Sequence, residues 1–376
     1  MENIQYLTND AIHSLLINLT KNEAINFRAT IEQALEDFSV GGERQYQPEP
    51  SGILRPNGQK TLFRPFTSDT SVGAKLVVEP PPGPGGRKEP LHGILILMDG
   101  QGNPTGVLAA EEVTGYRTSM NVMVPFSWRK HVNKIVIFGA GVQALWHTRL
   151  MLTLRGSEID TITYVSPRRD QVKALIERVS KENKPRSGSD CSFHFIDSTA
   201  VDFHEHIEAR LGETDCVFCT TPSTTPLFPA SYLTKRTNDD RQPLVSAIGS
   251  WQPHIIELDP SLLRHCIDAK GGYNPVTGEA KGVVLVDDRN YALENSGEVI
   301  KSEIMAEDMV ELGQIIALRK GRMQPPDEEH AEQADRFISE GFVVYKSIGV
   351  SLTDLAAGNA IIELIQSKQG GIDISS

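Results

Sequence analysis

The amino-acid sequence predicts an α/β protein with two domains. A parallel-sheet domain is expected over residues 126–329, and a second, α+β domain is expected from residues 1–125 together with 330–376. From about Lys134 onward, apolar runs of strand length alternate with segments of helical length, which is typical of a parallel sheet covered on both faces. The first 125 residues or so mix both kinds of segment without a repeated unit. After the polar stretch 319–335, a strand and a long apolar helix follow, and they can fold back on the N-terminal part.

Two helices and three strands are expected in the N-terminal part. The first helix covers residues 23–38, with Asn22 as its cap and the pair Gly41-Gly42 as its stop. Apolar runs of strand length then cover residues 74–79, 92–98 and 106–110. The second helix covers residues 111–126, with Pro125 near its end.

The parallel sheet is expected from six further apolar runs, separated by segments long enough for helices. These runs cover residues 134–139, 160–166, 191–197, 215–221, 244–250 and 282–288. Because parallel strands need crossover connections, this spacing favours a sheet with helices on both faces.

Composition narrows the class of protein. The formal net charge of −12 argues against binding to nucleic acid or to an anionic membrane surface, since clustered Lys and Arg form such surfaces. No apolar run reaches the roughly 18 residues of a membrane span, and the first residues lack the pattern of a signal peptide, so the cytoplasm is expected. Four cysteines do not make a disulfide framework, and the pair Cys216 and Cys219 lies in a strand-like run, so no metal site is expected.

The run Gly139-Ala140-Gly141-Val142-Gln143-Ala144 fits the pattern GxGxxG/A between a short strand and a helix. Gly139 allows the tight turn, Gly141 lets the backbone approach a pyrophosphate, and Ala144 allows close packing of the helix on the strand. The free N–H groups of the helix N-terminus favour the negative charge of the pyrophosphate. The sequence therefore predicts a Rossmann dinucleotide-binding domain; the alternative is a tight turn with no ligand.

The end of the next strand bears on which dinucleotide is bound. NAD-binding proteins place an acidic residue there, whereas this chain has Ser166, Arg168 and Arg169. A hydroxyl and guanidinium groups suit a 2′-phosphate, so NADPH is favoured over NADH. In the alternative, the arginines only begin a helix and Asp170 is the acid. Thr118, Thr220 and Thr221 complete the residues expected at the cofactor.

Taken together, these motifs resemble the ornithine cyclodeaminase/μ-crystallin family over most of the chain, from about Pro65 to Gln366. The matching segments are AKLV around Lys75, LHG around His92, GNPTGVLAAEEVTGYRT, GAGVQALWH, IGSWQPHIIELD, VLVDDRNYALENSGEV and YKSIGVSLTDLAAG. The resemblance implies a Rossmann domain plus a domain made from both chain ends, through which two subunits pair as a homodimer.

The resemblance also implies roles for individual residues. Lys75 and Arg117 match the positions that bind the substrate carboxylate beside the nicotinamide, a task that suits a point charge and a planar fork. Taken without the resemblance, each would be a solvated surface charge. His92 falls on a matching position, where either a catalytic or a structural role is open.

The chain departs from the cyclodeaminases of this family at three places. Trp251 stands where they carry an aspartate that helps proton transfer, and an indole cannot act as a general base. Leu62 stands where an acidic residue holds the distal amine of ornithine, and Pro50 stands where a third carboxylate-binding arginine is expected. The residues that can compensate for this arginine are Arg44, Arg55 and Arg64.

These departures favour an NADPH-dependent reductase of a C=N bond next to a carboxylate, as in the ketimine reductase branch that μ-crystallin represents. Its substrate is expected to be a cyclic or linear imino acid, with Trp251 and Arg64 in the pocket and Lys75 or His92 as proton donor. Two alternatives stay open. One is a cyclodeaminase or a dehydrogenase of N-substituted amino acids, which needs another acid such as Glu257 or Asp288. The other is a non-catalytic NADPH-binding protein.

Overall fold

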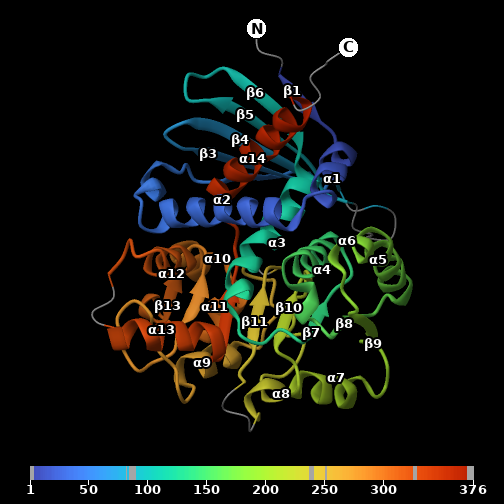
Figure 1. Cartoon of the computed structure of the whole chain (residues 1–376), viewed down its shortest axis with the longest axis vertical. Coiled ribbons are helices and arrows are strands. Elements are labelled where there is room, and N and C mark those ends of the chain that lie inside the picture. Colours follow the sequence, from blue (N-terminus) through green and yellow to red (C-terminus); the bar gives the residue numbers. More distant parts are fainter. Residues whose placement is uncertain are drawn as a thin grey trace. The chain divides into compact units, whose positions relative to one another are not determined.

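The structure, a computed structural model, describes residues 4–81, 83, 90–236, 241–249, 252–324 and 328–370. The chain divides into two compact units (Figure 1). Unit 1 combines the residues up to Arg117 with those from Val350 onward, and unit 2 covers Thr118–Gly349. Each unit has its own sheet.

Unit 1 is an α+β unit whose described strands form a six-stranded sheet in the order β1-β6-β5-β4-β3-β2. β1 pairs with β6 in parallel, and the other neighbours are antiparallel. Its elements are β1 (Gln5–Leu7), α1 (Asn9–Ile17), α2 (Lys21–Ser39), β2 (Ser51–Leu54), β3 (Lys60–Thr67), β4 (Ser71–Glu79), β5 (His92–Asp99), β6 (Pro104–Ala109), the start of α3 (Ala110–Trp128), and α14 (Ser351–Gly370).

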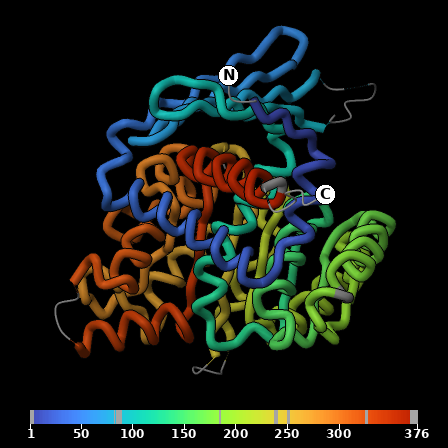
Figure 2. Tube along the Cα trace, turned by 45° about the horizontal axis from the view of Figure 1, so that its top comes forward, coloured from blue at the N-terminus to red at the C-terminus, as the bar shows by residue number. Residues whose placement is uncertain are grey.

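Helix α14 packs on one face of this sheet against β3, β4 and β5, and Figure 2 shows α2 beside α14. On that face Leu95 and Leu97 of β5 are fully buried. A Cβ atom on Gly358 of α14 would lie 2.7 Å from Leu97 Cδ1, so the helix packs closely on the strand. The cap of α2 is Thr20 rather than the expected Asn22, because Thr20 and Glu23 form a reciprocal capping box.

The other face of the sheet carries apolar side chains that no described helix covers. Phe63, Leu76 and Ile94 are register partners on β3, β4 and β5, so they point to the same side of the sheet. Ile96 follows two residues after Ile94 and shares this face. Phe63, Ile94 and Ile96 are 42%, 37% and 40% exposed.

Unit 2 is an α/β unit, and its described strands form an eight-stranded parallel sheet in the order β13-β12-β14-β11-β10-β7-β8-β9. The six strands that the sequence predicts are all present, as β7 to β12. Its strands are β7 (Lys134–Phe138), β8 (Thr161–Ser166), β9 (Ser192–Asp197), β10 (Cys216–Cys219), β11 (Leu244–Ala247), β12 (Val284–Val286), β13 (Met309–Glu311) and β14 (Val343–Lys346). Its helices, besides the end of α3, are α4 (Val142–Arg155), α5 (Arg169–Glu182), α6 (Lys184–Ser187), α7 (Phe203–Gly212), α8 (Ser231–Thr234), α9 (Pro260–Asp268), α10 (Arg289–Asn295), α11 (Gly297–Ser302), α12 (Leu312–Arg319) and α13 (Glu328–Glu340).

The expected boundary at residue 330 is wrong. Residues 330–349 belong to unit 2, because β14 pairs with both β11 and β12 near the middle of the parallel sheet. All four residues of β14 are buried, as a central strand requires. The first boundary also shifts, from residue 125 to the middle of α3, which continues from unit 1 into unit 2 after Arg117.

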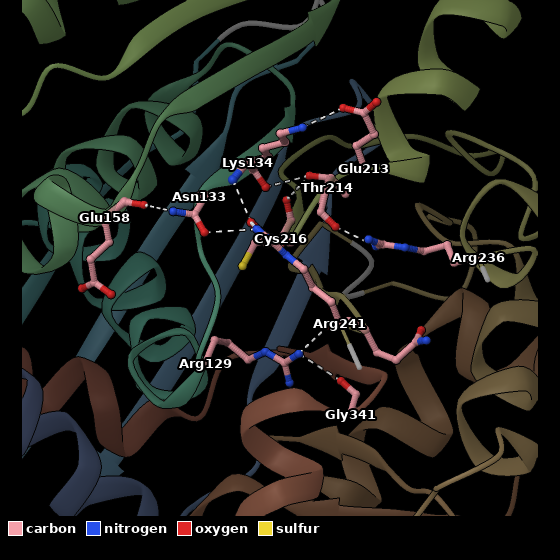
Figure 3. Close-up of polar contacts among 12 residues, drawn as sticks. Arg129, Asn133, Lys134, Glu158, Glu213, Thr214, Cys216, Arg236, Arg241 and Gly341 are labelled. Carbon is pink, nitrogen blue, oxygen red and sulfur yellow. Dashed lines mark hydrogen bonds and ion pairs between the residues drawn. The ribbon is translucent and has the colours of Figure 1, made fainter. Parts of the chain in front are cut away.

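At the N-terminal edge of the unit 2 sheet, a polar network connects the strand ends. Arg241 binds the buried carboxylate of Asp215 through two hydrogen bonds of 2.5 and 2.8 Å, and the backbone N–H of Lys134 donates to the same carboxylate at 2.9 Å. Arg129 donates to the carbonyl groups of Ile338, Gln242 and Gly341. Figure 3 shows Arg129, Lys134 and Arg241 within this network. The network is structural, since ligands of parallel α/β sheets bind at the opposite, C-terminal edge.

None of the helices that the structure describes is both long and apolar enough to cross a membrane.

Candidate active site

The structure brings Lys75 and Arg117 together in unit 1 around a third side chain, Asp354. Lys75 Nζ donates to Asp354 Oδ2 at 2.7 Å, and Arg117 Nε donates to Asp354 Oδ1 at 2.8 Å. All three side chains are at least 96% buried. We call these three residues the carboxylate cluster.

Three elements supply the carboxylate cluster. Lys75 points from β4 toward α14, as the alternation of a strand requires, because its register partner Leu95 is fully buried on the same side. Arg117 lies on α3, and Asp354 lies in the first turn of α14. An acid in the first turn of a helix is favoured by the helix dipole.

Charges and burial set the protonation of this cluster. Burial lowers the pKa of Lys75 to about 7, and the neighbouring Arg117 and Arg64 act in the same direction, while Asp354 opposes them. Burial alone would raise the pKa of Asp354, but the charges of Arg117, Lys75 and Arg64 outweigh it and lower that pKa to about 2. With Lys75 protonated, two positive groups and one negative group leave the cluster one net positive charge.

Arg117 still has a nitrogen that can donate a hydrogen bond to a ligand after its Nε binds Asp354. Its Nη1 atom is buried and has no hydrogen-bond partner among the described residues. A buried guanidinium nitrogen without a partner is costly, and a carboxylate is the ligand that satisfies it best. Arg64 of β3 is the register partner of Lys75 and so lies on the same side of the sheet, next to this cluster.

His92 is not brought to the carboxylate cluster within the chain. It lies on β5 two residues before Ile94, and therefore on the sheet face opposite to Lys75. Its side chain is 70% exposed, and Nδ1 lies 3.1 Å from Glu111 Oε1. Two other arginines were candidates to replace the third carboxylate-binding arginine. Of these, Arg44 lies over the ring of Phe38, and Arg55 begins the turn between β2 and β3. The catalytic role of His92 gains no support from this geometry.

The glycine turn, residues 139–144, lies in unit 2 between β7 and α4. Gly139 has φ +115°, a backbone conformation that favours glycine, and a Cβ there would lie 2.6 Å from Thr220 Oγ1. Gly141 is exposed, and a Cβ built on it would meet no atom within 4 Å. The N-cap residue of α4 is Gly141, which makes no side-chain cap hydrogen bond, and a helix N-terminus of this kind favours an anion. The turn fits a dinucleotide pyrophosphate.

Behind this turn, α4 is attached to α3. His147 Nδ1 lies 2.8 Å from Ser119 Oγ and 2.8 Å from the carbonyl oxygen of Gln143. Ser119 Oγ also donates to Gln143 Oε1 at 3.3 Å. Thr118 precedes Ser119 on the same helix and is half-buried. These contacts connect the first turn of α4 to the part of α3 that belongs to unit 2.

At the end of β8, the residues expected to select the dinucleotide differ in their contacts. Ser166 is buried, and its hydroxyl accepts the backbone N–H of Arg168 at 3.1 Å. The guanidinium of Arg169 lies over the ring of Phe195 at 4.7 Å. Arg168 and Arg169 are both exposed, and Arg169 differs from Arg168 in its contact with the aromatic ring.

The other described residues that the sequence predicts at the site form hydrogen bonds within unit 2. Thr220 Oγ1 donates to the carbonyl of Phe138, and both the backbone N–H and the hydroxyl of Thr221 donate to Glu257. Asp288 caps α10 by accepting the N–H of Tyr291. Trp251 lies outside the described residues. No group of three or more His, Cys, Asp or Glu in the described part of the chain could hold a metal ion.

The comparisons with known proteins agree with the fold. No family model matches the chain. The sequence is 26% identical over 360 residues to the Δ(1)-pyrroline-2-carboxylate reductase of Bacillus cereus, with 93% of each chain covered. It is 25% identical over 383 residues to an uncharacterized cyclodeaminase of Dictyostelium discoideum, with 96% of each covered. These similarities agree with the resemblance to the ornithine cyclodeaminase/μ-crystallin family that the sequence motifs indicate.

A solved structure shows the same fold. The Δ(1)-pyrroline-2-carboxylate reductase of Thermococcus litoralis, in complex with NADH and L-proline, superimposes with a TM-score of 0.71 at 17% sequence identity. The match covers 99% of this chain and 100% of that one. The Rossmann domain expected from the glycine turn is therefore confirmed, and the chain shares the fold of that reductase.

The resemblance to the ornithine cyclodeaminase/μ-crystallin family supplied Lys75 and Arg117 but not Asp354. The signal for Asp354 is nevertheless present in the sequence. It is the one charged residue in the mostly apolar stretch SLTDLAAGNAII, and a charge buried in a helix of this kind is almost always paired.

Proposed function

We propose that this chain is an NAD(P)H-dependent reductase of a C=N bond beside a carboxylate, with a cyclic or linear imino acid as its substrate. The observation that carries the proposal is the carboxylate cluster. There the buried Nη1 atom of Arg117 has no hydrogen-bond partner among the described residues, and the cluster has one net positive charge, which favours binding of an anion. The relatives support it, since the Bacillus cereus protein is named Δ(1)-pyrroline-2-carboxylate reductase and the Thermococcus litoralis structure of that enzyme contains NADH and L-proline.

The chemistry requires little of the protein beyond position and charge. Arg117 and Lys75 bind the substrate carboxylate and so fix the neighbouring carbon of the C=N bond. NAD(P)H, when bound, would supply the hydride that this carbon needs for the C=N bond to become a CH–NH bond. A protonated imine needs nothing more, whereas a neutral imine must also gain one proton at nitrogen. Lys75 can hold that proton, because burial brings its pKa to about 7.

The residues at the cofactor would be those of the glycine turn, with Thr118, Thr220 and Thr221 beside it. We propose NADPH as the preferred form, with Ser166 and Arg168 at the 2′-phosphate. Arg169 contributes less, since its guanidinium lies over Phe195. A 2′-phosphate binds guanidinium groups through charge-assisted hydrogen bonds.

The alternatives have weaker support. A cyclodeaminase would need an acid in place of the aspartate that Trp251 replaces. Asp288 is engaged as the cap of α10, and Glu257 is fully buried with three donors on its carboxylate. A protein that only binds NADPH has no use for a buried carboxylate cluster.

We also propose a homodimer, formed through the open face of the unit 1 sheet. Phe63, Ile94 and Ile96 expose apolar surface there, and contiguous apolar patches of this kind mark protein interfaces. A cytoplasmic location stays a prediction from the sequence.

The test is the oxidation of NADPH, followed by the loss of nicotinamide absorbance, with a five-membered and a six-membered cyclic imino acid. Turnover is expected with at least one of them, and Arg117→Lys should reduce kcat/KM by roughly a hundredfold because a lysine lacks the planar fork that presents separate donors to Asp354 and to the substrate carboxylate. Arg44→Lys is the matched control and should leave the rate unchanged. Binding of NADPH without any turnover would support the non-catalytic alternative, and ammonia release from L-ornithine with NAD⁺ would support the cyclodeaminase.

A further inference from the structure

Glu257 lies between two loops at the C-terminal edge of the unit 2 sheet and binds the backbone of both. Its Oε1 atom accepts the backbone N–H of Thr221 at 2.6 Å and the Thr221 hydroxyl at 3.0 Å. Its Oε2 atom accepts the backbone N–H of Gly249 at 2.6 Å. Thr221 follows β10 and Gly249 follows β11, which are neighbouring parallel strands, so both loops leave the same edge of the sheet. That edge is where ligands of parallel α/β sheets bind.

Close contacts connect Glu257 to the glycine turn. A Cβ on Gly139 would lie 2.6 Å from Thr220 Oγ1 and 3.4 Å from Thr221 Cγ2, so these two threonines pack directly against the turn. On the other side, a Cβ on Gly249 would lie 1.9 Å from the carbonyl oxygen of Thr221 and 2.8 Å from Glu257 Cδ. Only a glycine at residue 249 lets the loop approach the Glu257 carboxylate this closely.

Burial and the neighbouring donors act in opposite directions on the pKa of Glu257. The residue is 0% exposed, and burial raises its pKa to about 7 against the charge of Lys346 and the hydrogen bonds from Thr221 and Gly249. The other ionisable groups that influence this carboxyl or lie next to it are Glu298 on α11 and Cys219 on β10. A buried carboxylate is costly unless donors surround it, and three donors from two loops do so here.

Glu298 provides the contrast within the same cluster. It is also fully buried, and its Oε1 lies 3.5 Å from Lys346 Nζ, yet neither of its carboxylate oxygens has a hydrogen-bond partner among the described residues. It contacts neither of the two loops through a described hydrogen bond. Glu257 and Glu298 are therefore both buried glutamates, and they differ in that Glu257 alone has described hydrogen bonds to Thr221 and Gly249.

We propose that Glu257 is a positioning residue for the nucleotide: it holds the Thr220-Thr221 wall against the glycine turn and fixes that wall to the backbone of Gly249. The proposal rests on the proposed function, in which the glycine turn binds NAD(P)H. In Glu257→Gln one oxygen becomes an NH₂ group, which faces a backbone N–H instead of accepting from it. One of the two loops is then released.

The experiment compares Glu257→Gln with the matched variant Glu298→Gln, each as the full chain, by titrating NADPH with fluorescence detection. Glu257→Gln should raise the Kd of NADPH by about tenfold or more, as expected for the loss of hydrogen bonds to a charged group, while Glu298→Gln should change it by less than about threefold. With a cyclic imine at saturating concentration and NADPH varied, Glu257→Gln should raise the KM for NADPH far more than it lowers kcat. Glu257→Asp, which keeps the charge but is too short to reach both loops, should also weaken binding.

Equal weakening by Glu257→Gln and Glu298→Gln would overturn the proposal, because general damage to the cluster would then explain both. Unchanged NADPH affinity in both Glu257 variants would overturn it as well. If Glu257→Gln does not fold, the affinity of Glu257→Asp decides between these outcomes. Failure of the wild-type protein to bind either NADPH or NADH would instead overturn the proposed function, and this proposal with it.

Discussion

Lys75 has a pKa brought by burial to about 7, within the range where a proton donor works at neutral pH. If it donates the proton that a neutral imine takes up, kcat/KM should fall as pH rises through about 7, since only protonated Lys75 donates. Asp354 holds the pKa of Lys75 up, so Asp354→Asn should lower this pKa and move the falling limb to lower pH. The measurement is the pH profile of kcat/KM. Glu363→Gln, an exposed change on the same helix, should leave the limb in place, and an unmoved limb in Asp354→Asn would rule out Lys75 as the donor.

Arg168 and Arg169 allow a matched test of nucleotide preference. Arg168→Ala should raise the Kd of NADPH by about tenfold, the usual scale of one charge-assisted hydrogen bond to phosphate, and leave the Kd of NADH nearly unchanged. Arg169→Ala should have a smaller effect, because the guanidinium of Arg169 lies over Phe195. Equal affinity of the wild-type protein for NADPH and NADH would show that the 2′-phosphate is not recognised.

Single residues were predictable from sequence where the signal is local or where a family motif carries them. Gly139 and Gly141 follow from their spacing after a strand, and Lys75 and Arg117 follow from motifs. Asp354 did not follow, because its partners lie 279 and 237 residues away in the chain. No periodicity reports a pairing over that distance.

At the scale of elements, the parallel strands were predictable and part of the antiparallel sheet was not. The strands of unit 2 are buried on both faces and appear as continuous apolar runs. β3 escaped prediction because Pro65 interrupts it, and proline is excluded from central strands. The structure accommodates it because β2 pairs only with Lys60–Phe63, so β3 has no partner on that side at Pro65.

Helix α14 depends on a small residue for its packing. Gly358 lies one turn after Asp354 on the same face, and a side chain there would meet the tips of Leu95 and Leu97. Gly358→Val should therefore lower the free energy of unfolding by about 1–3 kcal/mol through overpacking and, by displacing α14, reduce imine turnover. Urea unfolding and the NADPH assay measure the two effects. Gln366→Val, on the exposed side of α14, is the control; equal stability of the two variants would contradict this packing.

At the scale of the whole molecule, the alternation of strands and helices predicted two units, but their boundaries depend on strand order. β14 starts at Val343, well after β12 ends at Val286 and with β13 between them in the sequence, yet it is inserted between β12 and β11 in the sheet. An apolar strand near the C-terminus is compatible with either unit until its neighbours are known. Strand order is a property of long-range packing, and this is why residues 330–349 were assigned to the wrong unit.

The face of the unit 1 sheet that no described helix covers predicts how two copies of the chain assemble. Phe63, Ile94 and Ile96 expose apolar surface in register on neighbouring strands, and a second copy of the chain that covers them would remove this surface from water. The double variant Ile94→Lys, Ile96→Lys should therefore be monomeric, since burying four lysines in a two-fold interface is far more costly than the apolar contact it replaces. Light scattering gives the mass, and Val201→Lys, at an isolated exposed residue of unit 2, should leave the dimer intact. A monomeric wild-type protein, or a double variant that still has twice the mass of the chain, would show that this face is not the subunit interface.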